Sequence, residues 1–216
     1  MIKAIIFDMD GLMFDTESAY SVVQTSMSEK RGKIFTNEVK KILMGKRANE
    51  VMELMNDFWD KDEKIEDLLK EQDGELVKIY NDSVEKMSGF DDFMNFLNLH
   101  NIRKCIGTSS RRFLVDVLLK KYGLENTLEF IVSGDEVEKG KPDPEIYNKC
   151  IEQLGVLPSD CLILEDSLNG IRAGVSAGCY TCAIPSEYTK DENFSLATMV
   201  CDSLGDQAIK DFIIKS

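Results

Sequence analysis

The sequence lacks any uninterrupted apolar run of the roughly eighteen residues that a membrane-spanning helix requires. It also lacks the long apolar stretch and small-residue cleavage site of a signal peptide, since its opening apolar run meets carboxylates at Asp8 and Asp10. We therefore expect a soluble, cytoplasmic protein with no membrane partner. Its 216 residues suffice for one compact domain with an insertion.

Positive charge is scarce, with 26 Lys and Arg residues against 39 Asp and Glu residues and a formal net charge of −13. Such a chain repels a nucleic-acid backbone unless its cations form a patch, and no such patch is visible in the sequence. We therefore expect no nucleic-acid partner. A phosphorylated small molecule would have to be met locally, by a few cations, a metal or backbone N–H groups.

Zinc-binding and redox patterns are also nearly absent. Most of the six cysteines lie in apolar runs, and the one C-x-x-C, at Cys179 and Cys182, has no second pair and no nearby histidine. The single histidine is His100. We interpret the cysteines as reduced core thiols rather than as metal ligands.

Short apolar runs rich in β-branched residues recur near the start and throughout the second half of the chain. They occupy residues 3–7, 103–107, 129–132, 161–164, 180–184 and 197–200. Their continuity is typical of strands buried on both faces. Segments with helical spacing alternate with them, at 90–100, 111–122, 143–154 and 169–177. The alternation predicts an α/β fold with a doubly wound, Rossmann-like parallel sheet covered by helices on both sides.

Residues 16–87 break this rhythm because they contain almost no strand-like run. Amphipathic spacing predicts helices there at 16–31, 36–44, 48–59, 62–71 and 74–86. We expect this segment to be a helical cap domain inserted after the first strand. Residues 1–15 and 88–216 would then form the α/β core.

Polar residues follow the predicted strands, where an open parallel sheet binds its ligands. Asp8 and Asp10 come directly after the first strand and are two residues apart, so on an extended segment they point the same way. Two close carboxylates are costly unless a cation offsets them. Glu165 and Asp166 follow another strand. Together these oxygen donors predict a hard divalent cation, most plausibly Mg²⁺.

Other residues at the same edge of the sheet suit a phosphate. Thr108 and Ser109 offer hydroxyl and N–H groups where a helix begins, and Lys141 lies in the turn G-K-P-D-P. Each motif has a simpler interpretation: turn chemistry for the D-x-D, a helix N-cap for Thr108 and Ser109, and a surface lysine for Lys141. Their recurrence at one edge favours the phosphate and metal site.

Four segments, in this order, resemble the four motifs of the haloacid-dehalogenase-like superfamily. They are D-M-D-G-L-M-F-D-T at 8–16, the strand end at Thr108 and Ser109, K-P-D-P-E-I-Y at 141–147, and L-E-D-S-L-N-G-I at 164–171. The helical insertion resembles the small cap of the subgroup that contains beta-phosphoglucomutase and many sugar-phosphate and nucleotide-type phosphatases. The resemblance spans essentially the whole chain.

The resemblance implies that Asp8 is the nucleophile that becomes an aspartyl phosphate, and that Asp10 is the acid and base. Dehalogenases of the superfamily lack the second aspartate, so Asp10 argues for phosphoryl transfer. Mg²⁺ would be held by Asp8, the backbone carbonyl of Asp10 and Asp166, with Glu165 as a ligand or support. The phosphoryl oxygens would be neutralised by Thr108, the Ser109 amide and Lys141.

The cap bears on whether the protein is a phosphatase or a mutase. Hexose-phosphate mutases of the subgroup carry a histidine shortly after the D-x-T, where this sequence has Glu17-Ser18-Ala19-Tyr20. The mutase arginine after the cap glycine is displaced, since Met44-Gly45-Lys46-Arg47-Ala48 brings Arg47 one position early. We therefore predict a phosphatase acting on a sugar phosphate or nucleoside-type phosphate, with a hexose-phosphate mutase as the alternative. Candidate cap contacts to the substrate are Glu17, Lys46 and Arg47, although the two cations would also suit a helix C-terminus.

Two further classes compete with an enzyme of this kind. A signalling receiver-like domain also places an acceptor aspartate, a threonine and a lysine around Mg²⁺, but on an inner strand of a shorter chain without a helical insertion. A non-catalytic cap-and-core protein would use the same fold to bind a partner. We expect a monomer with a small-molecule phosphoester as its ligand.

Overall fold

The computed structural model describes residues 2–43 and 46–215, and within them six strands form one parallel sheet in the order β3-β2-β1-β4-β5-β6. The strands are β1 (Ala4–Phe7), β2 (Arg103–Gly107), β3 (Ile131–Val132), β4 (Cys161–Glu165), β5 (Tyr180–Ala183) and β6 (Met199–Val200). The predicted doubly wound α/β fold is confirmed. Because strand order reverses between β1 and β4, the ligand crevice of such a sheet is expected beside β1.

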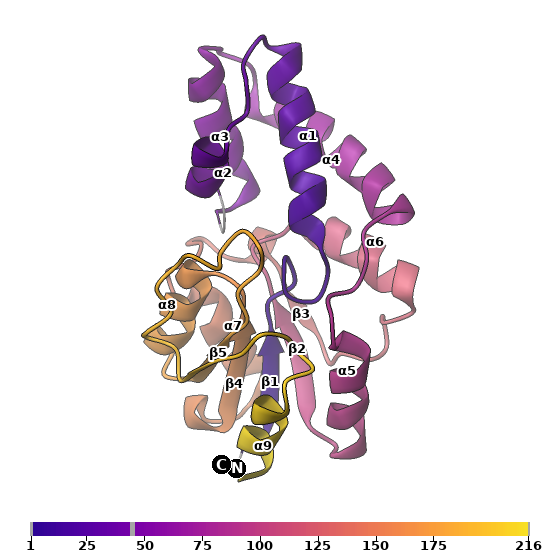
Figure 1. The fold of residues 1–216 in the computed structure, drawn as a ribbon, viewed down its shortest axis with the longest axis vertical. Coiled ribbons are helices and arrows are strands. Elements are labelled where there is room, and N and C mark those ends of the chain that lie inside the picture. Colours follow the sequence, from indigo (N-terminus) through magenta and orange to yellow (C-terminus); the bar gives the residue numbers. More distant parts are fainter. Residues whose placement is uncertain (1, 44–45, 216) are drawn as a thin grey trace.

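Helices cover both faces of the sheet (Figure 1). They are α5 (Phe90–Leu99), α6 (Arg112–Tyr122), α7 (Glu145–Leu154), α8 (Leu168–Ser176) and α9 (Gln207–Lys215). Side chains alternate across β1, so that Ile5 and Phe7 pack with α5, α6 and α9, whereas Ala4 and Ile6 pack with α7 and α8. This two-sided burial is the reason that the strands read as continuous apolar runs.

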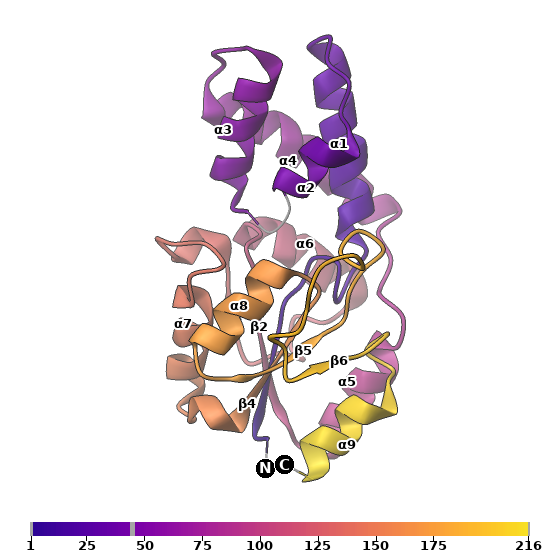
Figure 2. The same ribbon diagram turned by 60° about the vertical axis from the view of Figure 1, so that its left-hand side comes forward.

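The helix α9 was not predicted from the sequence. It follows β6 and lies beside α5 (Figure 2). Ile209 and Ile213, one turn apart, bury its apolar face. Two strands are also shorter than expected, since β3 and β6 each contain two residues. The six cysteines are free and buried.

Four helices follow β1 and lie beyond one end of the sheet (Figure 1): α1 (Thr16–Lys30), α2 (Asn37–Leu43), α3 (Ala48–Trp59) and α4 (Ile65–Asp82). Their packing centres on Trp59, whose indole N–H donates to Ser28 Oγ at 2.9 Å while Arg31 stacks 4.3 Å from the ring centroid. The second predicted helix, at 36–44, ends at residue 44, which lies outside the described residues. The prediction of two helices at 62–71 and 74–86 is wrong, because α4 runs unbroken through Gly74.

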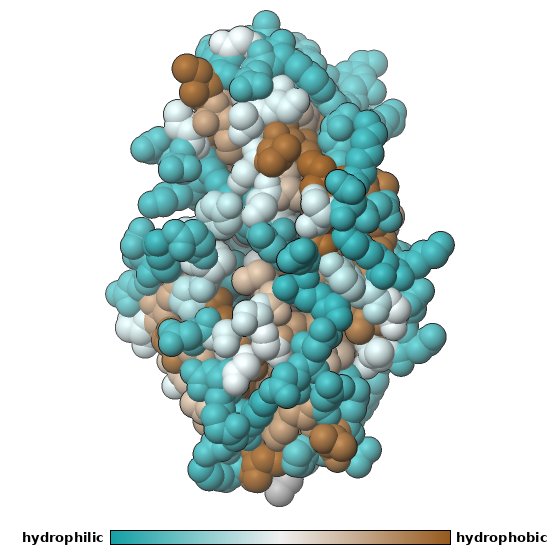
Figure 3. All heavy atoms as spheres, turned by 45° about the vertical axis from the view of Figure 1, so that its right-hand side comes forward, coloured by the Kyte–Doolittle hydropathy of each residue, from teal (hydrophilic) through white to brown (hydrophobic). Residues whose placement is uncertain are grey.

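Among the described helices, none is at once long and apolar enough to span a bilayer. Figure 3 shows one face of the molecule, where hydrophilic residues cover most of the surface and apolar residues occur in small groups. Charged residues make up 30% of the sequence, which accounts for this appearance.

Gly74 weakens α4 without serving a contact. It is exposed, and a methyl group added there would meet nothing within 4 Å. We expect Gly74→Ala to raise the free energy of unfolding by about 0.5–1 kcal/mol, because alanine has the higher helix propensity and restricts the unfolded chain. Urea unfolding measures this change. Gly89→Ala is the contrasting variant and should lower the free energy of unfolding. Gly89 has φ at +81°, and a Cβ added there would lie 2.1 Å from the Gly205 backbone nitrogen. A Gly74→Ala protein no more stable than wild type would contradict the argument.

Candidate active site

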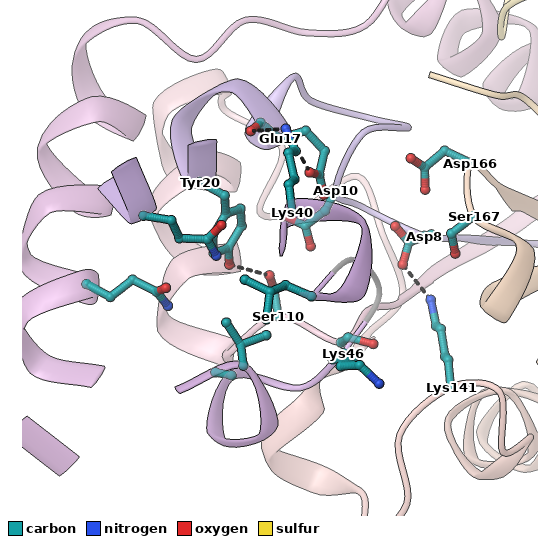
Figure 4. Close-up of a pocket in the computed structure, with 16 residues that line it drawn as sticks. Asp8, Asp10, Glu17, Tyr20, Lys40, Lys46, Ser110, Lys141, Asp166 and Ser167 are labelled. Carbon is teal, nitrogen blue, oxygen red and sulfur yellow. Dashed lines mark hydrogen bonds and ion pairs between the residues drawn. The ribbon is translucent and has the colours of Figure 1, made fainter. Parts of the chain in front are cut away.

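The predicted core residues converge at the carboxyl ends of the three central strands. Figure 4 shows Asp8, Asp10, Lys141 and Asp166 among them. Asp8 follows β1, Thr108 follows β2, and Glu165 ends β4. Strand pairing places Phe7 opposite both Ile106 and Leu164, and the Asp8 N–H donates to the Leu164 carbonyl at 3.0 Å. Asp8 is therefore flanked on both sides by residues from distant parts of the chain.

Lys141 reaches this point from the turn that precedes α7. Its Nζ lies 2.5 Å from Asp8 Oδ1, 2.6 Å from Glu165 Oε1 and 3.1 Å from the Gly107 carbonyl. Its side chain is only 3% exposed, so Lys141 is not a surface lysine. Burial disfavours the charged ammonium, but the charges of Asp8 and Glu165 outweigh that effect and raise the pKa of Lys141.

Glu165 is fully buried and fully hydrogen-bonded. Its Oε1 accepts from Lys141 and from the Tyr147 hydroxyl at 2.7 Å, while its Oε2 accepts from the Ser167 N–H and hydroxyl. Gly170 packs so closely that a Cβ would lie 1.7 Å from Oε1. With both oxygens engaged, Glu165 is arranged to hold Lys141 in place. Sequence analysis did not predict a role for Tyr147, although this residue lies within the K-P-D-P-E-I-Y motif.

A cluster of carboxylates suits a divalent cation. Within the described part of the chain, oxygen atoms of Asp8, Glu165 and Asp166 lie within 4.8 Å of one another. Burial raises the pKa of both Asp8 and Asp166, and neighbouring carboxylates raise them further, against the opposing charge of Lys141. One ammonium does not balance three buried carboxylates, and hard oxygen donors in excess favour Mg²⁺. Gly11 leaves room for this arrangement, since a Cβ there would lie 2.5 Å from Asp166 Oδ2.

Asp10 lies beside hydroxyl groups. The Thr108 hydroxyl donates to Asp10 Oδ2 at 3.0 Å, whereas Asp10 Oδ1 and the Ser109 hydroxyl are buried with no partner among the described residues. Burial raises the pKa of Asp10, and the nearby hydroxyl groups of Ser110, Thr16 and Thr108 oppose the shift. A carboxyl group with a raised pKa can hold a proton for transfer to a departing oxygen. Buried polar atoms without partners are uncommon and are satisfied when a polar ligand binds beside them.

The predicted cap residues fall into two groups. Glu17 and Lys46 line the cavity above Asp8, together with Asp10 and Lys141. Arg47 does not: its guanidinium donates to the Glu138 carbonyl at 2.6 Å, and it pairs with Glu50 at 2.7 Å. In this arrangement Arg47 joins α3 to the loop before α7, so its role in binding substrate stays a prediction. Met44 and Gly45, on which the comparison with mutases partly depends, lie outside the described residues.

Several lining residues escaped the sequence prediction. They are Tyr20, Gln24, Lys40, Gln72, Ser110 and Ser167. A signal existed for two of them, because Glu17, Tyr20 and Gln24 are spaced along one face of α1. Tyr20 on α1 and Ser110, between β2 and α6, have hydroxyl groups 3.2 Å apart (Figure 4). No local pattern marks Gln72, which reaches the cavity only because α4 packs against α1.

Comparison with known proteins agrees with this geometry. Residues 5–184 match the family described as haloacid dehalogenase-like hydrolase. Over 177 residues, the chain is 30% identical to the "Phosphorylated carbohydrates phosphatase" of Thermotoga maritima, covering 82% of each. Over 207 residues, it is 31% identical to the "Probable pseudouridine-5'-phosphatase" of Drosophila melanogaster, covering 93% of this chain and 89% of the relative. The crystal structure of CbbY from Rhodobacter sphaeroides in complex with phosphate has a TM-score of 0.85 at 26% identity, covering 95% of this chain and 96% of that one.

Proposed function

The chain belongs to the haloacid dehalogenase-like hydrolase family, and from this premise we propose that it is a phosphatase. Its substrate is a small phosphomonoester, a sugar phosphate or nucleoside-type phosphate, hydrolysed through an aspartyl phosphate on Asp8. The observation that carries the proposal is the buried contact of Lys141 with Asp8 inside a cluster of carboxylates at the strand ends. The names of the two phosphatase relatives support this substrate class.

The two aspartates divide the chemistry. An Asp8 oxygen attacks phosphorus and the P–O bond to the leaving group breaks, while Asp10 gives its proton to the departing oxygen. Water then attacks phosphorus and gives a proton to Asp10, while the bond between phosphorus and the Asp8 oxygen breaks. This second step releases inorganic phosphate and restores Asp8. The raised pKa of Asp10 suits the first of these steps, because it favours the protonated acid.

The remaining core residues position and neutralise the phosphoryl group. Lys141, Thr108 and the Ser109 N–H face its oxygens, where charge accumulates during transfer. Glu165 acts through Lys141, because it accepts a hydrogen bond that holds the ammonium at Asp8, and Tyr147 acts through Glu165, to which its hydroxyl donates. A side chain immobilised in this way loses little further freedom when the substrate arrives.

Mg²⁺ fits the carboxylates at this site. Asp8, Asp166 and the backbone carbonyl of Asp10 would hold it, with Glu165 as support. Bound there, the ion supplies positive charge that a chain with a net charge of −13 otherwise has little of. We also propose that residues 16–87 act as a cap domain over a core of 1–15 and 88–216.

Mg²⁺-dependent hydrolysis of a generic aryl phosphate tests the proposal. We expect phosphate release by the wild-type protein, its loss in EDTA, and a large loss in Asp10→Asn. Incubation with β-glucose 1-phosphate separates the alternative, because a mutase would form the 6-phosphate whereas a phosphatase releases phosphate. A folded wild-type protein that stays inert towards every phosphoester with Mg²⁺ would instead favour a binding protein.

A further inference from the structure

Tyr20 lies at the end of the cavity opposite Lys141 (Figure 4). Two side-chain amides also line the cavity: Gln24, one turn beyond Tyr20 on α1, and Gln72 on α4, which packs against α1. Gln72 is 1% exposed, and its Oε1 is buried with no hydrogen-bond partner in the described part of the chain. Gln24 is 5% exposed, and no described residue hydrogen-bonds its side-chain amide. A buried amide oxygen without a partner among the described residues, beside a cavity that a second unpaired amide also lines, indicates a polar ligand, because burying such a group alone is costly.

Charge at this end is already balanced. The Lys40 ammonium contacts the Glu17 backbone carbonyl at 3.3 Å, the Glu17 carboxylate at 3.7 Å and the Tyr188 ring centroid at 3.2 Å, and it hydrogen-bonds Ser21. Its side chain is 7% exposed. Lys40 is therefore occupied by groups of the protein and is poorly placed to receive an anion.

The other described lysines of the cavity serve the opposite end. Lys141 is enclosed between Asp8 and Glu165. Lys46 lies between Ser110 and Lys141 in the view of Figure 4. A second phosphate or a carboxylate at the Gln24 and Gln72 end would thus meet amides and the Glu17 carboxylate without a matching cation, and its desolvation would be uncompensated.

We infer that the leaving group of the substrate is uncharged and bears hydroxyl groups, which the side-chain amides of Gln24 and Gln72 bind. Each amide offers both an acceptor oxygen and donor N–H groups, so each can pair with an alcohol in either direction. Phosphomonoesters that carry a second anionic group are discriminated against. This inference rests on the proposed function and narrows its substrate class.

A substrate panel with the wild-type enzyme provides the first test. We expect kcat/KM for hexose and pentose monophosphates to exceed that for hexose bisphosphates and phosphoglycolate at least about tenfold, and deoxy analogues that lack a bound hydroxyl to lose about as much. A preference for a bisphosphate or for phosphoglycolate overturns the inference. If Lys46→Met then removes that preference, Lys46 is the residue that binds the second anionic group of the substrate. Hydrolysis of an aryl phosphate in the same experiment would leave the proposed function standing.

Substitution of the amides provides the second test. Methionine matches the length of glutamine without its polar atoms, so Gln72→Met and Gln24→Met should each lower the ratio of kcat/KM for a sugar phosphate over an aryl phosphate about tenfold or more. The matched control is Gln153→Met on the exposed side of α7, which should leave both activities unchanged. An unchanged ratio in both cavity variants overturns the inference. Circular dichroism checks that each variant is folded, and the wild-type panel decides the question independently of them.

Discussion

Replacing Asp8 with asparagine should abolish phosphate release, lowering kcat by about 10⁴-fold or more, because the amide cannot form the covalent intermediate. The fold should survive the change. Asparagine has nearly the same shape, and its oxygen can still accept from Lys141, which lies 2.5 Å from Asp8 Oδ1 in the wild-type protein. Phosphate release under single-turnover conditions measures the effect directly.

Asp116→Asn on α6 is a suitable control for the Asp8 variant. Asp116 is exposed and pairs with Arg112 one turn earlier in the same helix, so its loss should leave activity unchanged. Rapid acid quench with a radiolabelled substrate should find phosphate attached to the wild-type protein and none attached to the Asp8 variant. An Asp8→Asn enzyme that keeps even one-tenth of the wild-type rate would rule out Asp8 as the nucleophile.

Asp166→Asn should have opposite effects on activity and on stability. Activity should fall about 100-fold or more, because the proposed Mg²⁺ site loses a ligand. In the absence of metal, however, the free energy of unfolding should rise by about 1–2 kcal/mol, since one of three buried carboxylates becomes neutral. Thermal unfolding in EDTA and in Mg²⁺ measures both parts, because Mg²⁺ should raise the Tm of the wild type but not that of the variant.

The sign of the pH dependence follows from the raised pKa of Asp166. A carboxyl group whose pKa is raised on folding binds protons more tightly in the folded state, so its ionisation destabilises the protein as pH rises. The stability advantage of Asp166→Asn without metal should therefore be absent below the ordinary aspartate pKa of about 3.9 and should grow towards neutral pH. A variant less stable than wild type at pH 7.5 in EDTA would contradict the account of an overcharged cluster.

Much of the core was predictable because the decisive patterns are local. Each buried parallel strand appears as an apolar run, and the residues that follow it must lie at one edge of the sheet. Asp8, Thr108 and Glu165 were found in this way. The alternative of a surface lysine for Lys141 could not be settled locally, because its burial depends on carboxylates contributed by two other strands.

The helical insertion was predictable in kind but not in its details. Amphipathic spacing predicted two helices at 62–71 and 74–86, yet packing of Leu68, Leu76 and Tyr80 on the buried side keeps α4 continuous. Arg47 illustrates the same limit. Its charge suggested substrate binding, whereas its partners are a glutamate on its own helix and carbonyl groups of a loop about ninety residues away.

The amino-acid sequence by itself determined the α/β core, the helical insertion after the first strand and the acidic, hydroxyl and lysine groups at the strand ends, because strand burial and strand order leave few other arrangements. Only the tertiary structure decided that Glu165 supports Lys141, that Arg47 joins the cap helices to a core loop and that Gln24 and Gln72 face the cavity. Those contacts join residues that are distant in sequence, and their side-chain directions depend on how whole helices pack.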